Sequence, residues 1–177
     1  MEVNASKNDT IIDMGFGHGF SLLNFSKKSN KVYGLEVSLQ LHEIVTALLD
    51  EFDLKANLIV GDFFGIQNIN IKFDIIYFHA SFHHCNDPVR LMALLKRKLT
   101  KNGRVIFANE QIGSGMKYPW NICVQNMDAL LAVCKRGWFE VQYNEEFFLE
   151  LLERSGLCVD RTFNSDSGVK NFIVKQK

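Results

Sequence analysis

Apolar residues in the first 110 positions occur in short runs separated by segments with helical spacing. The runs predict five strands, at residues 10–14, 31–36, 56–60, 72–78 and 104–109. The fourth run is apolar without interruption from Ile75 to Phe78, which is typical of parallel strands that are buried on both faces. Alternating strands and helices predict an α/β protein with helices on both faces of a parallel sheet.

Two of the intervening segments carry clear helix signals. After Ser38, which can cap a helix, apolar side chains recur at three- and four-residue spacing. They form one stripe: Leu41, Ile44, Val45, Leu48, Leu49 and Phe52. Asp87 followed by Pro88 combines a capping acid with proline at the first helical position, so a second helix is expected to begin there.

The pattern changes after residue 110. Residues 111–143 contain Gly113, Gly115, Pro119 and a cluster of aromatic residues, with a short helix predicted around 127–134. Beyond them, a helix after Asn144 and strands at 158–163 and 169–174 are expected to close the fold. No repeat or linker is visible, so we expect a single domain over residues 1–177, with 111–143 as an insertion or lid.

Composition narrows the functional classes. Twenty basic and twenty acidic residues give a formal net charge of zero, which offers no electrostatic support for binding nucleic acid or an anionic membrane. No apolar run approaches the roughly 20 residues that span a bilayer. The four cysteines lack CxxC spacing, and the N-terminus has no signal-peptide core, so we expect reduced thiols and a cytoplasmic location.

The chemistry is concentrated in the segment Ile11 to Phe20, which reads IIDMGFGHGF. A short apolar strand ends there in an acid, Asp13, and in three glycines on alternate positions. Helix-compatible residues follow, so the loop should open onto a helix N-terminus whose free N–H groups favour electron-rich ligand atoms. A nicotinamide-binding loop would read G-x-G-x-x-G, whereas this one reads G-x-G-x-G.

The pattern D-x-G-x-G-x-G, from Asp13 to Gly19, resembles motif I of the class I S-adenosylmethionine-dependent methyltransferases. Three further blocks follow in the order of that family, namely Glu36, residues 61–63 (Gly-Asp-Phe) and residues 78–84 after the fourth strand. The resemblance implies a doubly wound Rossmann-like α/β sheet, mostly parallel with an antiparallel last strand. It covers about residues 10–110, and each block taken alone is unspecific.

The resemblance also implies how S-adenosyl-L-methionine would be held. Glu36 would accept hydrogen bonds from both ribose hydroxyls, Asp62 would take the adenine amino group, and Phe63 would lie beside the ring. The implied cofactor-binding residues are Asp13, Gly15, Phe16, Gly17, Gly19, Glu36, Val37, Asp62, Phe63 and His79. The alternatives are a tight turn for the glycine loop, a solvated acid for Glu36, a turn residue for Asp62 and core packing for Phe16 and Phe63.

Three histidines follow the fourth strand and are candidates for a general base. His83 is the first choice, and His79 and His84 are the others. A paired histidine here is also compatible with a structural or substrate-shaping role. With Asp87 as the nearest acid, the histidines do not complete a visible ligand set, so no metal is expected.

The substrate class follows from what the loop lacks. Residues 79–82 read His-Ala-Ser-Phe instead of the Asn/Asp-Pro-Pro-Tyr-like tetrad of enzymes that methylate amino groups of nucleic acids. A small-molecule or carbohydrate acceptor, methylated on oxygen, is therefore favoured over nucleic acid or membrane. Trp120, Trp138 and Tyr143 could contact such an acceptor on the substrate side of 111–143, or could be core residues.

Other functions remain possible at this point. A non-catalytic cofactor-binding or assembly module would keep the sheet without productive geometry, and an NAD-linked oxidoreductase would share the fold. Only about nine residues precede the first strand, whereas the family usually has covering helices there. The cover is therefore expected from 111–143, from a partner chain in a homodimer, or from a longer parent chain.

Overall fold

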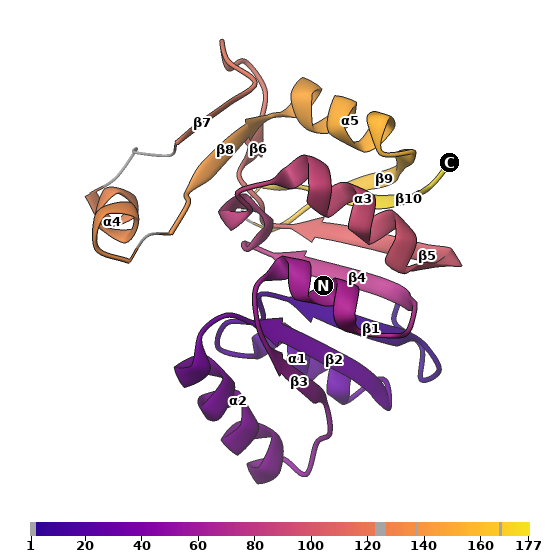
Figure 1. The fold of residues 1–177 in the computed structure, drawn as a ribbon. Coiled ribbons are helices and arrows are strands. Elements are labelled where there is room, and N and C mark those ends of the chain that lie inside the picture. The colour runs from indigo at the N-terminus through magenta and orange to yellow at the C-terminus, as the bar shows by residue number, and fades with distance from the viewer. Residues whose placement is uncertain (1–2, 123–126, 137, 167) are drawn as a thin grey trace.

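A seven-stranded sheet forms the centre of the protein, in the strand order β3-β2-β1-β4-β5-β10-β9 (Figure 1). The computed structural model describes residues 3–122, 127–136, 138–166 and 168–177. Strands β1 to β5 pair with one another in parallel, and β10 pairs antiparallel with both β5 and β9. The expected mostly parallel Rossmann-like sheet with an antiparallel last strand is confirmed.

The strands of this sheet are β1 (Thr10–Met14), β2 (Lys31–Glu36), β3 (Asn57–Val60), β4 (Phe73–His79), β5 (Leu99–Ala108), β9 (Leu157–Asn164) and β10 (Lys170–Gln176). The helical segments are α1 (Phe20–Ser26), α2 (Leu39–Glu51), η1 (Phe63–Asn68), η2 (Phe82–His84), α3 (Pro88–Lys98), α4 (Met127–Leu131), η3 (Ala132–Arg136) and α5 (Glu145–Arg154). Among the described residues, none of these helices combines the length and apolar character that a membrane crossing requires.

Helices cover both faces of the sheet, because successive strand residues point to opposite sides. On one face, residues such as Ile11 and Tyr77 pack with Leu22 of α1 and Val45 of α2. On the other face, the strands pack against η1, α3 and α5. The result is a three-layer arrangement in which the carboxyl ends of the parallel strands share one edge.

The capping residues expected for α2 and α3 are present in the structure. Ser38 Oγ accepts a hydrogen bond from the Leu41 N–H, and Asp87 Oδ1 accepts one from the Arg90 N–H, so both expected caps are present. The apolar stripe of α2 is only partly buried, since Ile44 and Phe52 are exposed. This difference arises because α2 covers β2 and β3 at the margin of the sheet, where only one side of the helix meets the core.

Residues after β5 form a second sheet that the sequence did not indicate. It has the order β6-β8-β7, from β6 (Ile112–Gly113), β7 (Trp120–Ile122) and β8 (Val141–Asn144). Figure 1 shows β7 and α4 extending away from the large sheet, beyond the carboxyl ends of β4 and β5. The expected short helix appears as α4 and η3, and part of the expected lid, residues 123–126 and 137, lies outside the described residues.

Candidate active site

The glycine loop after β1 leaves its backbone exposed to a ligand. Gly15, Gly17 and Gly19 have φ angles of 75°, 53° and 83°, which favour glycine over residues with a Cβ atom. A Cβ atom added to Gly17 would meet nothing within 4 Å, so open space lies beside this part of the loop. A Cβ atom on Gly15 would instead lie 2.9 Å from the Ser81 Cβ, because the loop after β4 packs against it.

Asp13 is completely buried at the end of β1. Its Oδ2 accepts a hydrogen bond of 2.5 Å from Ser21 Oγ, which ties the strand to α1, while Oδ1 has no partner among the described residues. Burial raises the pKa of Asp13, the Ser21 hydrogen bond lowers it, and the nearby charge of Glu36 raises it; together they bring the pKa to about 7. An orphaned, buried carboxylate oxygen needs a donor, such as an ammonium group or a water molecule.

Glu36 connects the glycine loop to the start of α2. Its Oε2 accepts the Gly17 N–H at 3.0 Å, and its Oε1 accepts the Ser38 N–H at 3.0 Å. The residue is buried, which is unlike the solvated strand-end acid that was the alternative interpretation. Each carboxylate oxygen can accept more than one hydrogen bond, so both remain able to receive a hydroxyl. The next residue, Val37, is exposed.

The residues implied for adenine lie at the end of β3. Asp62 Oδ1 accepts the N–H groups of Phe64 and Gly65 and so caps η1, which confirms a turn role for this oxygen. The side chain is exposed. Phe63 is half-buried and packs edge-to-face on Phe78, with ring centroids 5.6 Å apart. The Phe63 ring therefore packs partly against the core, and it also lies beside Gly15 of the glycine loop.

Phe16 is the exception among the implied cofactor residues. Its side chain is buried in the core beneath α1, with its ring against Gly34 of β2, where an added Cβ atom would lie 2.6 Å from Phe16 Cδ1. The side chain is therefore a packing element, as the alternative interpretation held, and only the Phe16 backbone remains on the loop.

The loop after β4 lies directly against the glycine loop. Ala80 has a φ angle of 48°, a left-handed conformation that is unusual for alanine and is held only where the surroundings fix it. Ser81 Oγ then donates a 2.7 Å hydrogen bond to the carbonyl oxygen of Met14, the residue before Gly15. This bond brings η2, with its two histidines, next to the glycine loop.

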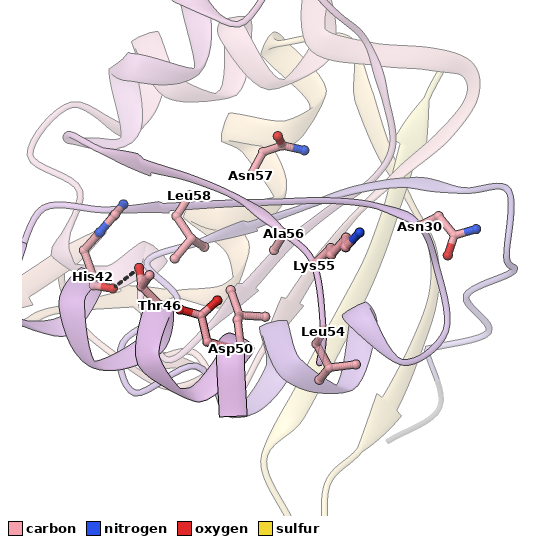
Figure 2. Close-up of a pocket in the computed structure, with 10 residues that line it drawn as sticks. Asn30, His42, Thr46, Asp50, Leu54, Lys55, Ala56, Asn57 and Leu58 are labelled. Atoms are coloured by element: carbon pink, nitrogen blue, oxygen red, sulfur yellow. Dashed lines mark hydrogen bonds between the residues drawn. The ribbon is translucent and has the colours of Figure 1, made fainter. Parts of the chain in front are cut away.

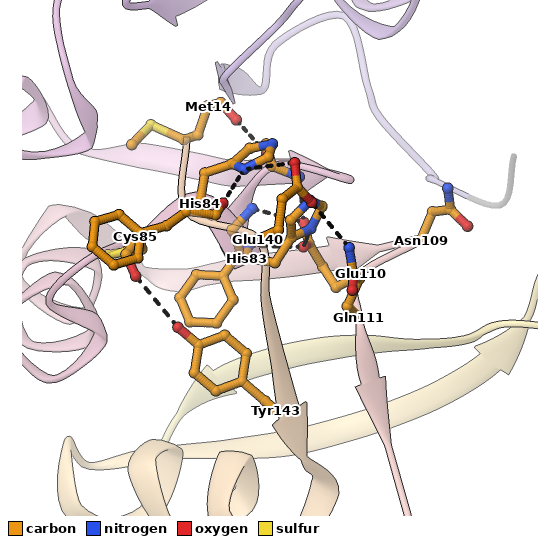
Figure 3. A network of polar contacts seen from close by, with 12 residues as sticks. Met14, His83, His84, Cys85, Asn109, Glu110, Gln111, Glu140 and Tyr143 are labelled. Atoms are coloured by element: carbon orange, nitrogen blue, oxygen red, sulfur yellow. Dashed lines mark hydrogen bonds and ion pairs between the residues drawn. The ribbon is translucent and has the colours of Figure 1, made fainter. Parts of the chain in front are cut away.

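Glu110 holds this loop in place, although it was not among the residues expected at the site. Its buried carboxylate accepts the N–H groups of Ser81, Phe82 and His83 at 2.9, 2.9 and 3.1 Å (Figure 3). The same carboxylate lies 2.9 Å from His83 Nδ1. Glu110 closely follows β5, so the signal that identified Glu36, an acid at the end of a strand, could also have found it.

The three candidate histidines have different surroundings. His79 is exposed at the end of β4 and stacks on Tyr77, with ring centroids 6.3 Å apart. His83 is buried between two acids, with Nε2 3.6 Å from an oxygen of Glu140. His84 is half-buried, and its Nδ1 lies 2.6 Å from the carbonyl oxygen of Phe139.

Residues 111–143 contribute to this site through Glu140 and Tyr143. The Tyr143 ring packs on Phe82 with centroids 5.3 Å apart, and its hydroxyl donates to the carbonyl oxygen of Cys85 at 3.4 Å (Figure 3). Burial raises the pKa of this hydroxyl well above its ordinary value. Tyr143 is therefore a core residue, whereas Trp120 and Trp138 are exposed.

A surface hollow of about 630 Å³ lies elsewhere, along α2 and β3 (Figure 2). It is lined by aliphatic side chains such as Leu54 and Leu58 and by scattered polar residues that include His42 and Asp50. Neither the glycine loop nor η2 contributes to its lining. We therefore place the candidate site at the glycine loop and η2, where acids, histidines and open glycine backbone lie close together, and not at this hollow.

The residues at the sheet edge fit S-adenosyl-L-methionine. The orphaned Asp13 Oδ1 can receive a donor, the space at Gly17 admits a ligand, and the Glu36 carboxylate can receive hydroxyl groups. These features lie at the carboxyl ends of β1 and β2, where ligands of open α/β sheets bind. The chain thus supplies acceptors for the ammonium and ribose groups of that cofactor.

Comparisons with known proteins agree with this geometry. Residues 12–107, more than half of the chain, match the family described as methyltransferase domain. No curated protein matches the sequence. Many solved structures share the fold. A S-adenosylmethionine-dependent methyltransferase from Clostridium acetobutylicum superimposes with a TM-score of 0.70 at 16% identity, over 94% of this chain and 83% of that one.

Two larger proteins whose names mention small molecules, mitomycin and pyocyanin, are also similar in structure. The mitomycin 7-O-methyltransferase MmcR has a TM-score of 0.69 and 21% identity, and the match covers 97% of this chain and 50% of that one. The pyocyanin biosynthetic protein PhzM has a TM-score of 0.67 and 16% identity, over 99% and 52%. This chain thus spans about half the length of each. The match to the methyltransferase domain, together with the glycine loop and the strand-end acids, shows that the chain belongs to this family and is an S-adenosylmethionine-dependent methyltransferase.

Proposed function

We propose that the protein methylates an oxygen atom of a small-molecule or glycan acceptor. The observation that carries this proposal is the Glu110–His83 pair, with 2.9 Å between carboxylate and Nδ1. His83 lies on the loop after β4, and Ser81, two residues before it, bonds that loop to the end of β1. A proton acceptor is thereby held next to the cofactor loop, where a hydroxyl nucleophile would need one.

His83 would act as the general base through Nε2. When bound, S-adenosylmethionine supplies a methyl group activated by the sulfonium, and its leaving group is a neutral thioether. Glu110 would accept a hydrogen bond from the Nδ1–H group, which would fix the tautomer with the lone pair on Nε2 and stabilise the imidazolium that forms. Holding the acceptor in line would supply much of the remaining barrier reduction, about 7–11 kcal/mol for well-oriented reactants.

Glu140 lies beside His83 Nε2, the atom that the acceptor hydroxyl would have to approach. Its Oε2 lies 3.6 Å from His83 Nε2, and the side chain is mostly shielded. An acceptor hydroxyl would replace this carboxylate beside Nε2. Since Glu140 directly precedes β8, residues 111–143 would adjust as the acceptor enters, consistent with a substrate-side lid within a single domain.

Exposed aromatic side chains support a ring-bearing acceptor. Trp120, Trp138 and Tyr118 are all exposed on residues 111–143, and the Trp138 ring centroid lies 6.0 Å from that of His84. Aromatic faces suit the C–H surfaces of sugars as well as flat aromatic molecules. One of the structurally similar proteins is named as a 7-O-methyltransferase, which makes oxygen the first acceptor atom to test.

The test is formation of S-adenosylhomocysteine with panels of phenols, hydroxylated aromatics, sugars and matched amines. Oxygen methylation requires turnover with a hydroxyl acceptor and loss of that turnover in His83→Ala while cofactor binding is retained. Turnover only with amines would contradict the assignment of oxygen. Cofactor binding without turnover on any panel would favour the alternative, a non-catalytic binding or assembly module.

A further inference from the structure

A second ligand-binding arrangement overlaps the acceptor side of the site. His83, His84 and Glu140 each offer one ligand atom, and these atoms all lie within 4.8 Å of one another. The two histidines are neighbours on η2, whereas Glu140 comes from the other end of residues 111–143. Two histidines and one carboxylate form a ligand set that first-row transition metals use in proteins.

Hydrogen bonding prepares the histidines for this role. Since a carboxylate accepts hydrogen bonds, His83 Nδ1 donates to Glu110, and the neutral imidazole then presents its Nε2 lone pair towards Glu140. A carboxylate behind a histidine ligand is the arrangement that orients metal-binding imidazoles and raises their basicity. His84 Nδ1 donates to the carbonyl oxygen of Phe139, so its own lone pair lies on Nε2, and use of Nδ1 would require that hydrogen bond to break.

The separations fit a shared cation better than direct hydrogen bonds. Glu140 Oε2 lies 3.6 Å from His83 Nε2, and Glu140 Oε1 lies 3.7 Å from His84 Nδ1. Hydrogen bonds from nitrogen to oxygen span about 2.7–3.2 Å. Two ligand atoms bonded to one tetrahedral zinc ion at about 2.0–2.2 Å lie about 3.4 Å apart. These two separations are close to that value, and the three ligand atoms all lie within 4.8 Å of one another. Binding one ion would require small side-chain movements, including release of His84 Nδ1 from the carbonyl oxygen of Phe139.

Charge also favours a cation at Glu140. The Glu110 carboxylate receives three backbone N–H groups and the His83 imidazole, which stabilise its charge. Glu140 receives a hydrogen bond of 3.2 Å from Gln111 Nε2, and its side chain is only 13% exposed. Among the described residues, no lysine or arginine forms an ion pair with Glu140, so its charge is poorly compensated.

We propose that His83, His84 and Glu140 bind one divalent transition-metal cation such as Zn²⁺, with the remaining coordination position left to water. The 32% exposed side chain of His84 provides the route from solvent. The cation would fasten residues 111–143 to η2. If the proposed function also holds, it would occupy the Nε2 lone pair that accepts the acceptor's proton, so the metal-bound form would be inhibited.

Binding can be tested without any methyl transfer. The full-length protein is freed of metal with a chelator, and Zn²⁺ is titrated in a calorimeter in the absence of cofactor and acceptor; Co²⁺ is titrated in parallel by visible absorption. One ion per chain is expected. His84→Ala and Glu140→Gln should each lower the affinity at least 10-fold, and Glu110→Gln, which removes the orienting carboxylate, by roughly 10–100-fold.

His42→Ala and Glu146→Gln serve as matched controls, because both residues lie on other helices and should leave the affinity unchanged. Thermal unfolding of each variant checks that the chain is folded. Failure of the wild-type protein to bind either ion, or equal affinity in folded Glu140→Gln, overturns the proposal. Binding with normal turnover would keep the metal site and contradict only the assignment of His83 as base.

Discussion

The carboxylate of Glu110 lies 2.9 Å from Nδ1 of His83, although 27 residues separate the two in the chain. The contact depends on two adjacent strands that both end in a left-handed residue, Ala80 after β4 and Asn109 after β5. These turns bring Glu110 under the loop that carries His83. The pair accordingly combines a structural role, closing the loop by backbone hydrogen bonds, with the orientation of one imidazole.

His83→Ala should lower turnover by roughly 10²–10⁴-fold, the usual contribution of a positioned general base. Cofactor affinity should change little, because the imidazole faces Glu110 and Glu140 and not the glycine loop. Turnover and cofactor affinity measured separately for His79→Ala, His83→Ala and His84→Ala identify the base, with His42→Ala as control. Normal turnover in all three would mean that the site works by positioning alone.

Gly17→Val should abolish cofactor binding while leaving the protein folded. The added side chain enters the open space beside the loop, and a left-handed conformation costs a residue with Cβ roughly 1–2 kcal/mol. Gly168→Val is a matched control, since Gly168 also has a positive φ angle and open space but lies between β9 and β10. Both should unfold at lower temperature, and only Gly17→Val should lose S-adenosylmethionine in calorimetry. Unchanged affinity in folded Gly17→Val would remove the loop from the cofactor site.

Glu36→Ala should weaken cofactor binding by roughly 1.5–3 kcal/mol, the range for hydrogen bonds to a charged group. It also removes the acceptor of the Gly17 and Ser38 N–H groups, so thermal stability should fall as well. Adenine, which lacks the ribose, should bind the variant and the wild type equally. Exposed Glu43 on α2 offers the control Glu43→Ala. Full cofactor affinity in Glu36→Ala would leave Glu36 a structural acid only.

Asp13 should make the apo protein less stable as the pH rises from about 4 to 7. Its pKa is about 7 in the folded protein, against an ordinary 3.8, so the folded state holds the proton over this interval and the unfolded state does not. The contribution of Asp13 to stability is therefore fully present below pH 3.8 and declines up to the folded pKa, by an amount on the order of a few kcal/mol. Asp13→Asn should remove this slope, and exposed Asp50→Asn should keep it, in denaturant titrations at several pH values. Parallel curves for wild type and Asp13→Asn would contradict the raised pKa.

Turnover should survive removal of metal ions. A histidine base and a neutral leaving thioether meet the needs of methyl transfer to a hydroxyl without a Lewis acid. The measurement is turnover before and after dialysis against EDTA, followed by addition of single divalent metals. Loss of activity in EDTA that one metal restores would show that the cation assists catalysis instead of blocking His83.

Local signals in the sequence determined the sheet and the cofactor edge. The bounds of β1 and β2 and the caps of α2 and α3 follow from apolar runs and capping residues, which act within a few positions of the chain. Glycine spacing and strand-end acids identified the loop for the same reason, since parallel strands place their carboxyl ends along one edge. Strand β5 begins earlier than its apolar run indicated, at Leu99, because Leu99 pairs with Phe73 of β4 on the far side of an irregularity in the register.

Only the tertiary structure decided which side chains meet at that edge. Glu140 had no signal in the sequence, because its partners on η2 lie more than 50 residues away and are reached through a small sheet whose strands are only two to four residues long. Phe16 was implied as a cofactor contact, but its ring is packed beneath α1, since burial depends on the neighbours that a helix brings and not on the motif. The sequence thus determined the family and the cofactor edge, whereas long-range packing decided the surroundings of His83.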